Sequence, residues 1–454
     1  MNFIVIVTDS LRADHVGCYG APVKTPNIDA FAADSAVFEQ AYSENVPTMP
    51  CRAAWWTGLH LFPHRGWQPF EHSDYLMAEM LWNRGFTSAL ISDTYHMHKP
   101  GYNCDRGFDT VKWIRGQEYD PWIVDPSIKV DLDRNHRLRG DESDDRWRRL
   151  FGQYLRNASV RKSEEDYCVA RVFTEAVRWL EAVTRKRKDK LFLWVDSFEP
   201  HEAWDPPSPY REMYDPDYTG QELIDPVPGP VEGYMTDEEV NHTKALYAGD
   251  VTFVDKWVGL LLDRIKELGL YDNSLIMLTS DHGEPFGEHG IIRKARCCGY
   301  EELARIPWII RHPEGLGRGR RCAAFVQPPD MLPTVLDALD IKSSPRRSAK
   351  GMDCLAGDPP EDAPRFTGRS IVPILKGETE ALRDFAITAQ SGGRWAFRTE
   401  DWMYLVPRNP GSDKEPAELY NRHNDRYEQT NVRDRNPDIA VELDRRLRAF
   451  AEEV

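Results

Sequence analysis

Four short apolar runs along the chain each stop abruptly at a polar or charged residue. The runs and the residues that follow them are Phe3 to Val7 before Thr8-Asp9-Ser10, Ala89 to Ile91 before Ser92-Asp93-Thr94, Leu191 to Val195 before Asp196, and Leu275 to Leu278 before Thr279-Ser280-Asp281-His282-Gly283. Continuous apolar runs of this length are typical of strands that are buried on both faces. The pattern therefore predicts four strands of a buried, largely parallel sheet.

Helical spacing of apolar positions fills the regions between these runs. The clearest helix is predicted from about Val251 to Leu268, ending near Gly269, with its apolar residues on one stripe. Strands that alternate with helices predict a doubly wound α/β fold, in which ligands bind beyond the carboxyl ends of the strands. This topology places four residues at one rim: Asp9, Asp93, Asp281 and His282.

Two stretches interrupt the α/β pattern. Residues 115–165 are rich in Asp and Arg, and residues 205–233 are rich in Pro and Asp, so both are interpreted as surface insertions. From about residue 361 the chain shows strand patterns of its own and a closing charged helix. We therefore expect a catalytic domain over residues 1–360 and a smaller C-terminal α+β subdomain over residues 361–454 that packs on it.

Composition narrows the class of partner. The 454 residues can bury a large core, and 58 Lys and Arg against 74 Asp and Glu give a net charge of −16, which repels nucleic acid and anionic membranes. The N-terminus reads as a strand and not as a signal peptide, and no apolar run approaches the ~18 residues of a membrane helix. The eight cysteines are scattered without a C-x-x-C pair. A reduced, cytoplasmic protein is expected, with no nucleic acid or membrane partner and with homo-oligomer formation left open.

Asp281 and His282 form a candidate metal site, because a carboxylate and an imidazole suit ions such as Mn²⁺ or Zn²⁺. Taken alone, the pair is also compatible with a strand-end turn in which Asp281 caps the next segment. Asp9 adds a second carboxylate at the same predicted rim. Three such groups together favour a metal.

The stretch around Arg52 is a candidate anion site. Arg52 lies four residues after Thr48, near the expected start of a helix, and a helix N-terminus with a guanidinium attracts anions. The alternative is an ordinary surface ion pair. His201 in "FEPHEAW" and Lys294 in "GIIRKA" are further candidates for proton transfer or anion binding, although a lone His or Lys is more often structural or solvated.

Several motifs occur together in the order and spacing of a known family. They are "IVIVTDSLRADHVGCYG", "NVPTMPCRAAWWTG", "LWVDSFEPHEAW", "NSLIMLTSDHGEPFGEHG", the Lys294 that follows, "DMLPTVLDAL" and the closing "AELYNRHNDRYEQTNV". Over nearly its whole length the chain resembles the sulfatase and phosphonate monoester hydrolase branch of the alkaline phosphatase superfamily. The resemblance implies an α/β sandwich around a large mixed, mostly parallel sheet, a divalent metal, and in-line attack on a phosphorus or sulfur centre.

The key motif of that family departs from its usual form in this chain. Sulfatases carry Cys-x-Pro-Ser-Arg, whose cysteine is oxidised to formylglycine, whereas this chain reads Thr48-Met49-Pro50-Cys51-Arg52. Thr48 takes the place of the nucleophile, and Cys51 takes the place of the serine. The resemblance therefore implies Thr48 as the nucleophile and no formylglycine.

Two further departures bear on the metal and the substrate. Sulfatases have two successive aspartates where this chain has Asp9-Ser10, and Gly-Lys-x-His where it offers Asp93, Thr94 and His96, a pattern closer to the phosphonate monoester hydrolases and their phosphodiesterase relatives. No Asp-x-x-x-His motif is placed to build a second metal site. We expect one divalent ion, with Mn²⁺ or Zn²⁺ favoured over Ca²⁺. Its predicted ligands are Asp9, Thr48, Asp281 and His282.

The resulting hypothesis is a metal-dependent hydrolase of small anionic esters, either phosphodiesters or phosphonate monoesters, that forms a covalent intermediate on Thr48. Arg52 and Lys294 are expected to neutralise the anion, His201 or Lys294 to protonate the leaving group, and Thr94 to assist. Three alternatives remain open. They are a sulfatase that uses a threonine, a transferase that passes the group to an alcohol, and a binding protein with an inactive site.

Overall fold

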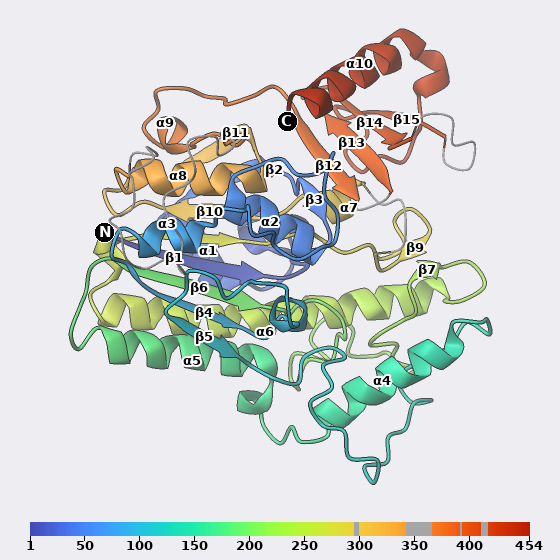
Figure 1. Cartoon of the computed structure of the whole chain (residues 1–454). Coiled ribbons are helices and arrows are strands. Elements are labelled where there is room, and N and C mark those ends of the chain that lie inside the picture. Colours follow the sequence, from blue (N-terminus) through green and yellow to red (C-terminus); the bar gives the residue numbers. More distant parts are fainter. Residues whose placement is uncertain (295–298, 342–365, 391–392, 410–415) are drawn as a thin grey trace.

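The computed structural model describes residues 1–294, 299–341, 366–390, 393–409 and 416–454. A sheet of eight strands lies at its centre, in the order β11-β2-β10-β8-β1-β6-β4-β5 (Figure 1). All strands run in one direction except β10, which is antiparallel to both of its neighbours. The predicted α/β fold around a mixed, mostly parallel sheet is confirmed. The strands are β1 (Asn2–Thr8), β2 (Ala36–Ala41), β4 (Thr87–Ser92), β5 (Thr110–Trp113), β6 (Leu191–Ser197), β8 (Ser274–Thr279), β10 (Trp308–Arg311) and β11 (Arg321–Val326).

The four apolar runs form four adjacent strands, β8, β1, β6 and β4. In the register of the central strand, Ile6 lies opposite Val195 on one side and Leu278 on the other. Every residue of β1 is buried, because helices cover both faces of the sheet. The polar residues that end these strands therefore meet at one edge.

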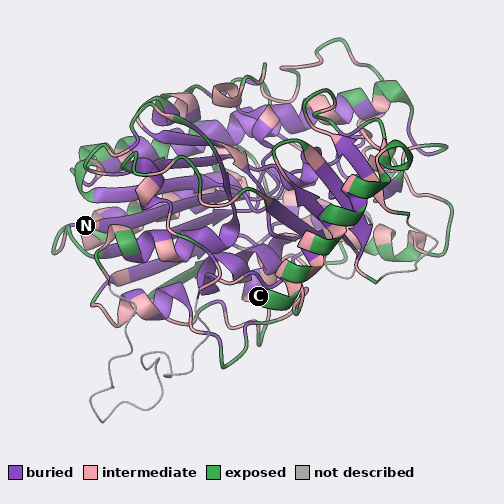
Figure 2. Ribbon diagram, turned by 90° about the horizontal axis from the view of Figure 1, so that it is seen from above, coloured by how far each residue is buried: buried purple, intermediate pink, exposed green. Residues whose placement is uncertain are grey.

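Helices form a layer on each face of the sheet (Figure 1). Ile4 and Ile6 pack with α1 (Pro26–Ala33), α5 (Cys168–Val183) and α6 (Asp237–Glu267). Phe3 and Val5 point the other way and pack with α2 (Thr48–Thr57), α3 (Met77–Trp82) and α8 (Met331–Ala338). Successive side chains of β1 thus belong to two separate apolar cores, one on each face of the sheet. Figure 2 shows the buried strands between these layers.

The long helix α6 begins well before the predicted start near Val251. Its first residue is Asp237, and the side chain of Thr236 accepts the backbone N–H of Glu239 while the Glu239 carboxylate accepts the N–H of Thr236. This capping box is a local signal that marks a helix start independently of the apolar stripe. The predicted end is confirmed, since the helix stops at Glu267 and Gly269 adopts a φ of +68°.

The two stretches interpreted as insertions hold few regular elements. The first contains α4 (Asp144–Ala158), which lies at the lower right of Figure 1. The first insertion does not lie wholly on the surface, because Gln117 and Glu118 near its start are buried. In the second, β7 (Gly229–Pro230) pairs with β9 (Ile291–Ile292), which lies just before Lys294.

A second sheet of five strands, in the order β15-β14-β13-β12-β3, holds the C-terminal part of the chain. Its edge strand β3 (Asn45–Val46) comes from the loop just before Thr48, so this sheet includes residues of the N-terminal part. The predicted boundary at 360/361 lies outside the described residues. The remaining elements are α7 (Glu301–Ala304), α9 (Val372–Leu375), β12 (Ala386–Gln390), β13 (Arg394–Arg398), β14 (Trp402–Pro407), β15 (Glu418–Asn421) and α10 (Pro437–Glu453).

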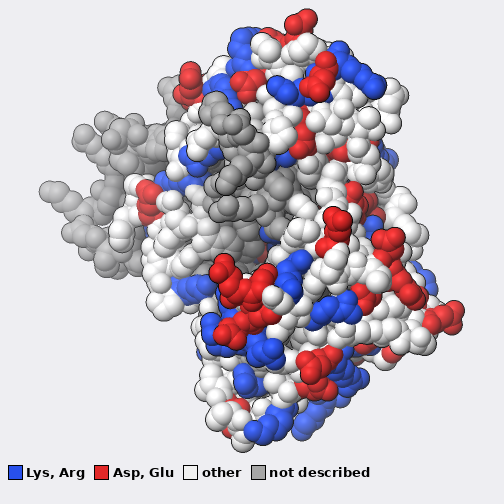
Figure 3. All heavy atoms as spheres, turned by 90° about the vertical axis from the view of Figure 1, so that its right-hand side faces the viewer, with Lys and Arg blue, Asp and Glu red and all other residues white. Residues whose placement is uncertain are grey.

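The surface carries both signs of charge. Figure 3 shows acidic and basic side chains interspersed on the face that corresponds to the right-hand side of Figure 1. None of the described helices combines the length and the apolar composition needed to cross a membrane. The absence of a nucleic acid partner stays a prediction from the net charge.

Candidate active site

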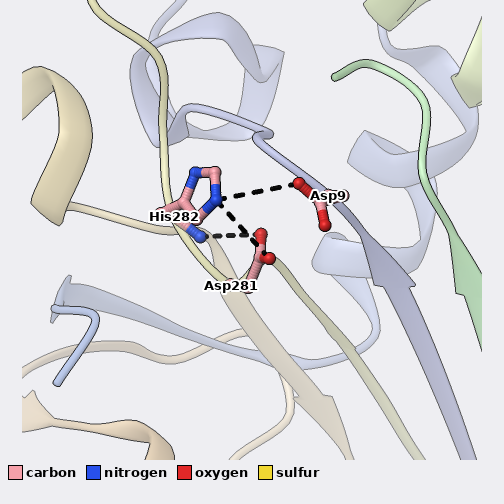
Figure 4. Close-up of side chains that lie close together, drawn as sticks. All are labelled: Asp9, Asp281 and His282. Atoms are coloured by element: carbon pink, nitrogen blue, oxygen red, sulfur yellow. Dashed lines mark hydrogen bonds and ion pairs between the residues drawn. The ribbon is translucent and has the colours of Figure 1, made fainter. Parts of the chain in front are cut away.

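Three side chains converge at the carboxyl ends of β1 and β8 (Figure 4). The potential ligand atoms of Asp9, Asp281 and His282 lie within 4.8 Å of one another, and all three residues are fully buried. His282 Nε2 is 3.8 Å from Asp9 Oδ1 and 3.6 Å from Asp281 Oδ2. The structure thus brings together three of the four predicted metal ligands.

The His282 ring presents a free nitrogen to the two carboxylates. Its Nδ1 lies 2.8 Å from the carbonyl of Gly283, which assigns the ring proton to Nδ1 and leaves a lone pair on Nε2. Nε2 is buried and has no hydrogen-bond partner among the described residues. A buried acceptor that faces two carboxylates is costly unless a cation lies between them, so the donor set fits a divalent ion.

Ser10 orients both carboxylates. Its backbone N–H donates to Asp281 Oδ1 at 3.1 Å, and its hydroxyl donates to Asp9 Oδ1 at 3.2 Å. Ser10 makes these bonds in a left-handed backbone conformation, with a φ of +59°. Ser10, which stands at the position of the second aspartate of sulfatases, therefore acts here as a hydrogen-bond donor to Asp9 and Asp281.

Burial and charge act differently on the two aspartates. Burial, together with the nearby Asp281 carboxylate, raises the pKa of Asp9. Burial also acts to raise the pKa of Asp281, but His282 and Arg52 hold it below its ordinary value. Burial lowers the pKa of His282, which favours the neutral, ligating imidazole.

Thr48 is the first residue of α2, directly after Pro47. It is 2% exposed and adopts a φ of +21°. Arg52 connects it to the cluster, because one nitrogen, Nη1, donates to the Thr48 carbonyl at 3.0 Å and to Asp281 Oδ2 at 2.8 Å. The Thr48 hydroxyl makes no hydrogen bond within the part of the chain that the structure describes. Its roles as nucleophile and metal ligand stay predictions.

Cys51 lies in a different environment from Thr48. Its side chain is fully buried in the apolar core that also contains Met49 and Trp55. Burial, followed by the charge of Asp281, raises the pKa of the Cys51 thiol. The thiol therefore stays protonated and is a poor nucleophile.

Arg52 is fully buried, so the alternative of a surface ion pair is wrong. Because α2 begins at Thr48, Arg52 lies in its second turn and points back into the site. Its five N–H groups each have an acceptor: Asp196 Oδ2 at 3.0 Å, Asp196 Oδ1 at 2.6 Å, Asp9 Oδ2 at 3.1 Å, Asp281 Oδ2 at 2.8 Å and the Thr48 carbonyl at 3.0 Å. The guanidinium thus acts on the site through its charge and through the aspartates that it holds.

Asp196 is a site residue that sequence reasoning did not single out. It follows the apolar run Leu191 to Val195, just as Asp9 follows the first run, and this position was its signal. Its carboxylate also accepts the Thr94 hydroxyl at 2.7 Å and the Trp194 indole N–H at 3.0 Å. The predicted Thr94 thus reaches the site through Asp196.

His201 and Lys294 belong to a second polar cluster. Lys294 Nζ donates to Glu202 Oε2 at 2.8 Å and also to Glu284, while His201 Nδ1 faces the Glu202 carbonyl at 2.9 Å. Burial acts to lower the pKa of Lys294, but Glu202 and Glu284 raise it above its ordinary value, so the ammonium stays charged. Burial lowers the pKa of His201 to about 3, so its ring is neutral.

This second cluster lies close to the first. The charge of Lys294 acts on the pKa of both Asp9 and His282. Glu202 and Glu284 had not been predicted, although Glu284 follows His282 by two residues and Glu202 follows His201 directly. All the predicted site residues therefore lie in or beside one buried polar region.

Asp93 does not join the metal-ligand group, although the topology placed it on the same rim. Its Oδ1 accepts the backbone N–H of Phe198 at 2.7 Å. His96, three residues after Asp93, has its Nε2 3.0 Å from Glu118 Oε2. These contacts tie the loop after β4 to the loop after β6 and to the first insertion.

Most of the chain matches one known protein family. Residues 1–341 match the family described as Sulfatase. The chain belongs to the sulfatase family. Within this family, a protein of Escherichia coli (strain K12) described as uncharacterized sulfatase YidJ is 27% identical over 364 residues, which are 75% of this chain and 68% of that protein.

Solved structures extend the likeness of fold to almost the whole chain. The phosphonate monoester hydrolase of Agrobacterium radiobacter gives a TM-score of 0.73 at 21% identity, covering 99% of this chain and 95% of that one. The phosphonate monoester hydrolase of Silicibacter pomeroyi gives a TM-score of 0.72 at 23% identity, covering 100% of this chain and 94% of that one.

The protein is thus a hydrolase of the sulfatase family. Members of the sulfatase family bind a divalent metal, which agrees with the Asp9-Asp281-His282 donor set.

Proposed function

We propose that this hydrolase cleaves phosphodiesters or phosphonate monoesters through a covalent intermediate on Thr48. The observation that carries the proposal is the position of Thr48 at the start of α2, where Arg52 links its carbonyl to Asp281. The threonine stands where the family's formylglycine motif has its cysteine. The likeness of fold to two phosphonate monoester hydrolases supports the same class.

The metal would be held by Asp9, Asp281 and His282, with Thr48 completing the set. When bound, a divalent ion supplies positive charge that lowers the pKa of a nearby hydroxyl and stabilises negative charge on the reacting group. The imidazole nitrogen and the replacement of a carboxylate by Ser10 favour Mn²⁺ or Zn²⁺ over Ca²⁺.

The side chains account for both steps of the reaction. In the first step the Thr48 hydroxyl gives its proton to solvent and Oγ1 forms a bond to phosphorus, while the bond to the leaving oxygen breaks and Lys294 protonates that oxygen. In the second step water attacks phosphorus and the bond to Thr48 breaks, while His201 takes a proton from the water and passes it to solvent, and the Thr48 oxygen regains a proton from solvent. Arg52 supports the site by holding Asp9 and Asp281 in place.

The threonine favours phosphorus over sulfur. A formylglycine hydrate can expel sulfate by breaking its own C–O bond, whereas a threonine has no second hydroxyl to do this. Water must therefore attack the central atom of the intermediate. A sulfated threonine lacks the internal route and is expected to persist, while a phosphorylated one can be hydrolysed with His201 as base.

The test compares kcat/KM for a nitrophenyl phosphonate, bis-nitrophenyl phosphate and nitrophenyl sulfate on one preparation saturated with Mn²⁺ or Zn²⁺. We expect the two phosphorus substrates to be cleaved better, and Thr48→Ala to lose about 10³-fold or more in kcat, with Thr48→Ser as the matched variant that keeps a hydroxyl. Multiple-turnover sulfate cleavage above both phosphorus esters would overturn the proposal.

Sulfate ester hydrolysis is the second candidate, because the family and its Escherichia coli relative carry that description. Intact-protein mass spectrometry during incubation with the sulfate ester separates the two candidates. Accumulation of a sulfated Thr48 supports the phosphorus preference, and its rapid turnover supports a sulfatase. Transfer to an added alcohol would identify a transferase.

A further inference from the structure

Asp196 accepts four hydrogen bonds in the interior of the protein. Two come from Arg52 at 3.0 and 2.6 Å, one from the Thr94 hydroxyl at 2.7 Å and one from the Trp194 indole at 3.0 Å. The residue is fully buried, as is its partner Arg52. A buried carboxylate with this many donors is held in one orientation.

The same guanidinium also binds two of the three potential metal ligands. Arg52 donates to Asp9 Oδ2 at 3.1 Å and to Asp281 Oδ2 at 2.8 Å. A fixed positive charge beside these carboxylates opposes the binding of a divalent cation, because like charges repel more strongly in a buried site than in water. Asp196 is the third carboxylate on Arg52, and its ion pair with Arg52 at 2.6 Å offsets that charge.

Asp196 lies outside the ligand group itself. Among the described residues, the acidic and histidine side chains that converge within 4.8 Å are those of Asp9, Asp281 and His282. Asp196 is therefore not expected to ligate the cation, and its contact with the ligand group runs through Arg52.

We propose that Asp196 is a positioning residue that holds Arg52 in place and cancels its charge, so that Asp9 and Asp281 remain available to a divalent cation. The inference rests on the metal site of the proposed function but not on the identity of the substrate. Without Asp196, the unrestrained guanidinium competes with the cation for the two carboxylates.

The experiment measures Mn²⁺ binding to metal-free protein by calorimetry, without substrate. Asp196→Asn is expected to raise the Mn²⁺ dissociation constant by about tenfold or more, which is the loss of affinity found when groups that support metal ligands are removed. The matched control is Asp330→Asn, which removes a fully buried aspartate paired with Arg383 at 2.5 Å outside the site. This control is expected to stay within about threefold of wild type.

A folded Asp196→Asn variant with wild-type Mn²⁺ affinity would overturn the proposal. If that variant does not fold, the double variant Arg52→Met with Asp196→Asn takes its place, because removal of both partners of a buried pair is better tolerated than removal of one. Since Asp196 acts through Arg52, its removal is expected to change Mn²⁺ affinity by no more than about threefold when Arg52→Met is already present. A loss of tenfold or more from Arg52→Met to the double variant would also overturn the proposal.

Because this readout needs no turnover, it separates the two hypotheses. If the enzyme cleaves neither phosphorus ester but Asp196→Asn weakens Mn²⁺ binding, the proposed function is wrong and this inference stands. An active phosphodiesterase whose Asp196→Asn variant binds Mn²⁺ normally loses only this inference.

Discussion

Thr48 and Cys51 are three residues apart, and their surroundings give them different chemistry. The Thr48 side chain lies at the start of α2, whereas the Cys51 thiol lies in the apolar core with a raised pKa, chiefly because of burial. A buried, protonated thiol is slow to react. This contrast supports the proposal that Thr48, and not Cys51, carries the covalent chemistry.

The first prediction is that Cys51 remains an unmodified cysteine in the active protein. Mass spectrometry of the peptide that spans residues 43–58 is expected to show the unmodified mass. Replacement of Cys51 by Ser, which preserves its size, is expected to leave turnover measurable. The mass change of conversion to formylglycine at Cys51 would contradict the assignment.

The second prediction concerns Glu44, a fully buried residue in the loop that leads to Thr48. Its Oε1 accepts the backbone N–H groups of Leu61 and Phe62 at 2.8 Å each, but burial outweighs these bonds and raises its pKa to about 8. The pKa of Glu44 is higher in the folded than in the unfolded protein, so protonated Glu44 contributes to the free energy of unfolding. This contribution is complete at about pH 4.5 and is lost as the pH rises to about 8.

Urea unfolding at pH 5.5 and pH 7.5 tests this. Wild-type protein is expected to lose stability between these values with a slope of up to about 1.4 kcal/mol per pH unit from this residue. Glu44→Gln should remove that part of the slope, and the exposed Glu380→Gln serves as control. Parallel pH profiles for Glu44→Gln and wild type would refute the prediction.

At the scale of elements, the first insertion does more than cover the surface. Its residues Gln117 and Glu118 are buried, and Glu118 Oε2 lies 3.0 Å from His96 Nε2. Lys99 Nζ lies 3.2 Å from the other ring nitrogen of His96, so both sides of the ring are occupied. The insertion thereby holds the turn that follows Thr94.

The third prediction follows from this contact. Glu118→Gln is expected to lower kcat/KM for bis-nitrophenyl phosphate by about tenfold, since loss of the charge that faces His96 at 3.0 Å loosens the turn after Thr94 and displaces site groups. The control is Glu142→Gln, an exposed glutamate of the same insertion. Equal kinetics for both variants and wild type would show that the insertion does not support the site.

At the scale of the whole molecule, the C-terminal sheet is joined to segments that lead to Thr48 and Lys294. The strand β3, just before Thr48, pairs with β12. In a second connection, His289 bonds to Glu302 at 2.7 Å and to the carbonyl of Glu428 at 2.9 Å, which ties the segment before Lys294 to the C-terminal part.

The fourth prediction is that the C-terminal sheet cannot be removed. A chain that ends at residue 383 lacks the partner strand of β3 and exposes the apolar residues that pack on it, such as Tyr300 and Leu303. We expect it to aggregate or to lose cooperative thermal unfolding, measured by circular dichroism. A soluble, cooperatively folded and active shortened chain would show instead that the two parts are independent domains.

The sequence alone determined the features that leave a local trace. Continuous apolar runs predicted the strands β1, β4, β6 and β8, because burial on both faces excludes polar residues from each of them. The polar residues at the ends of those runs predicted the cluster of Asp9, Asp281 and His282, because parallel strands end at one rim of the sheet.

Only the tertiary structure decided which polar groups face one another. Arg52 meets Asp9, Asp196 and Asp281 across separations of 43, 144 and 229 residues, and Glu118 reaches His96 from an irregular segment. The pairing of β3 with β12 is equally distant. Hydrophobic periodicity records the environment of each residue within its own helix or strand, whereas a hydrogen bond between distant loops depends on where the packed layers place their ends.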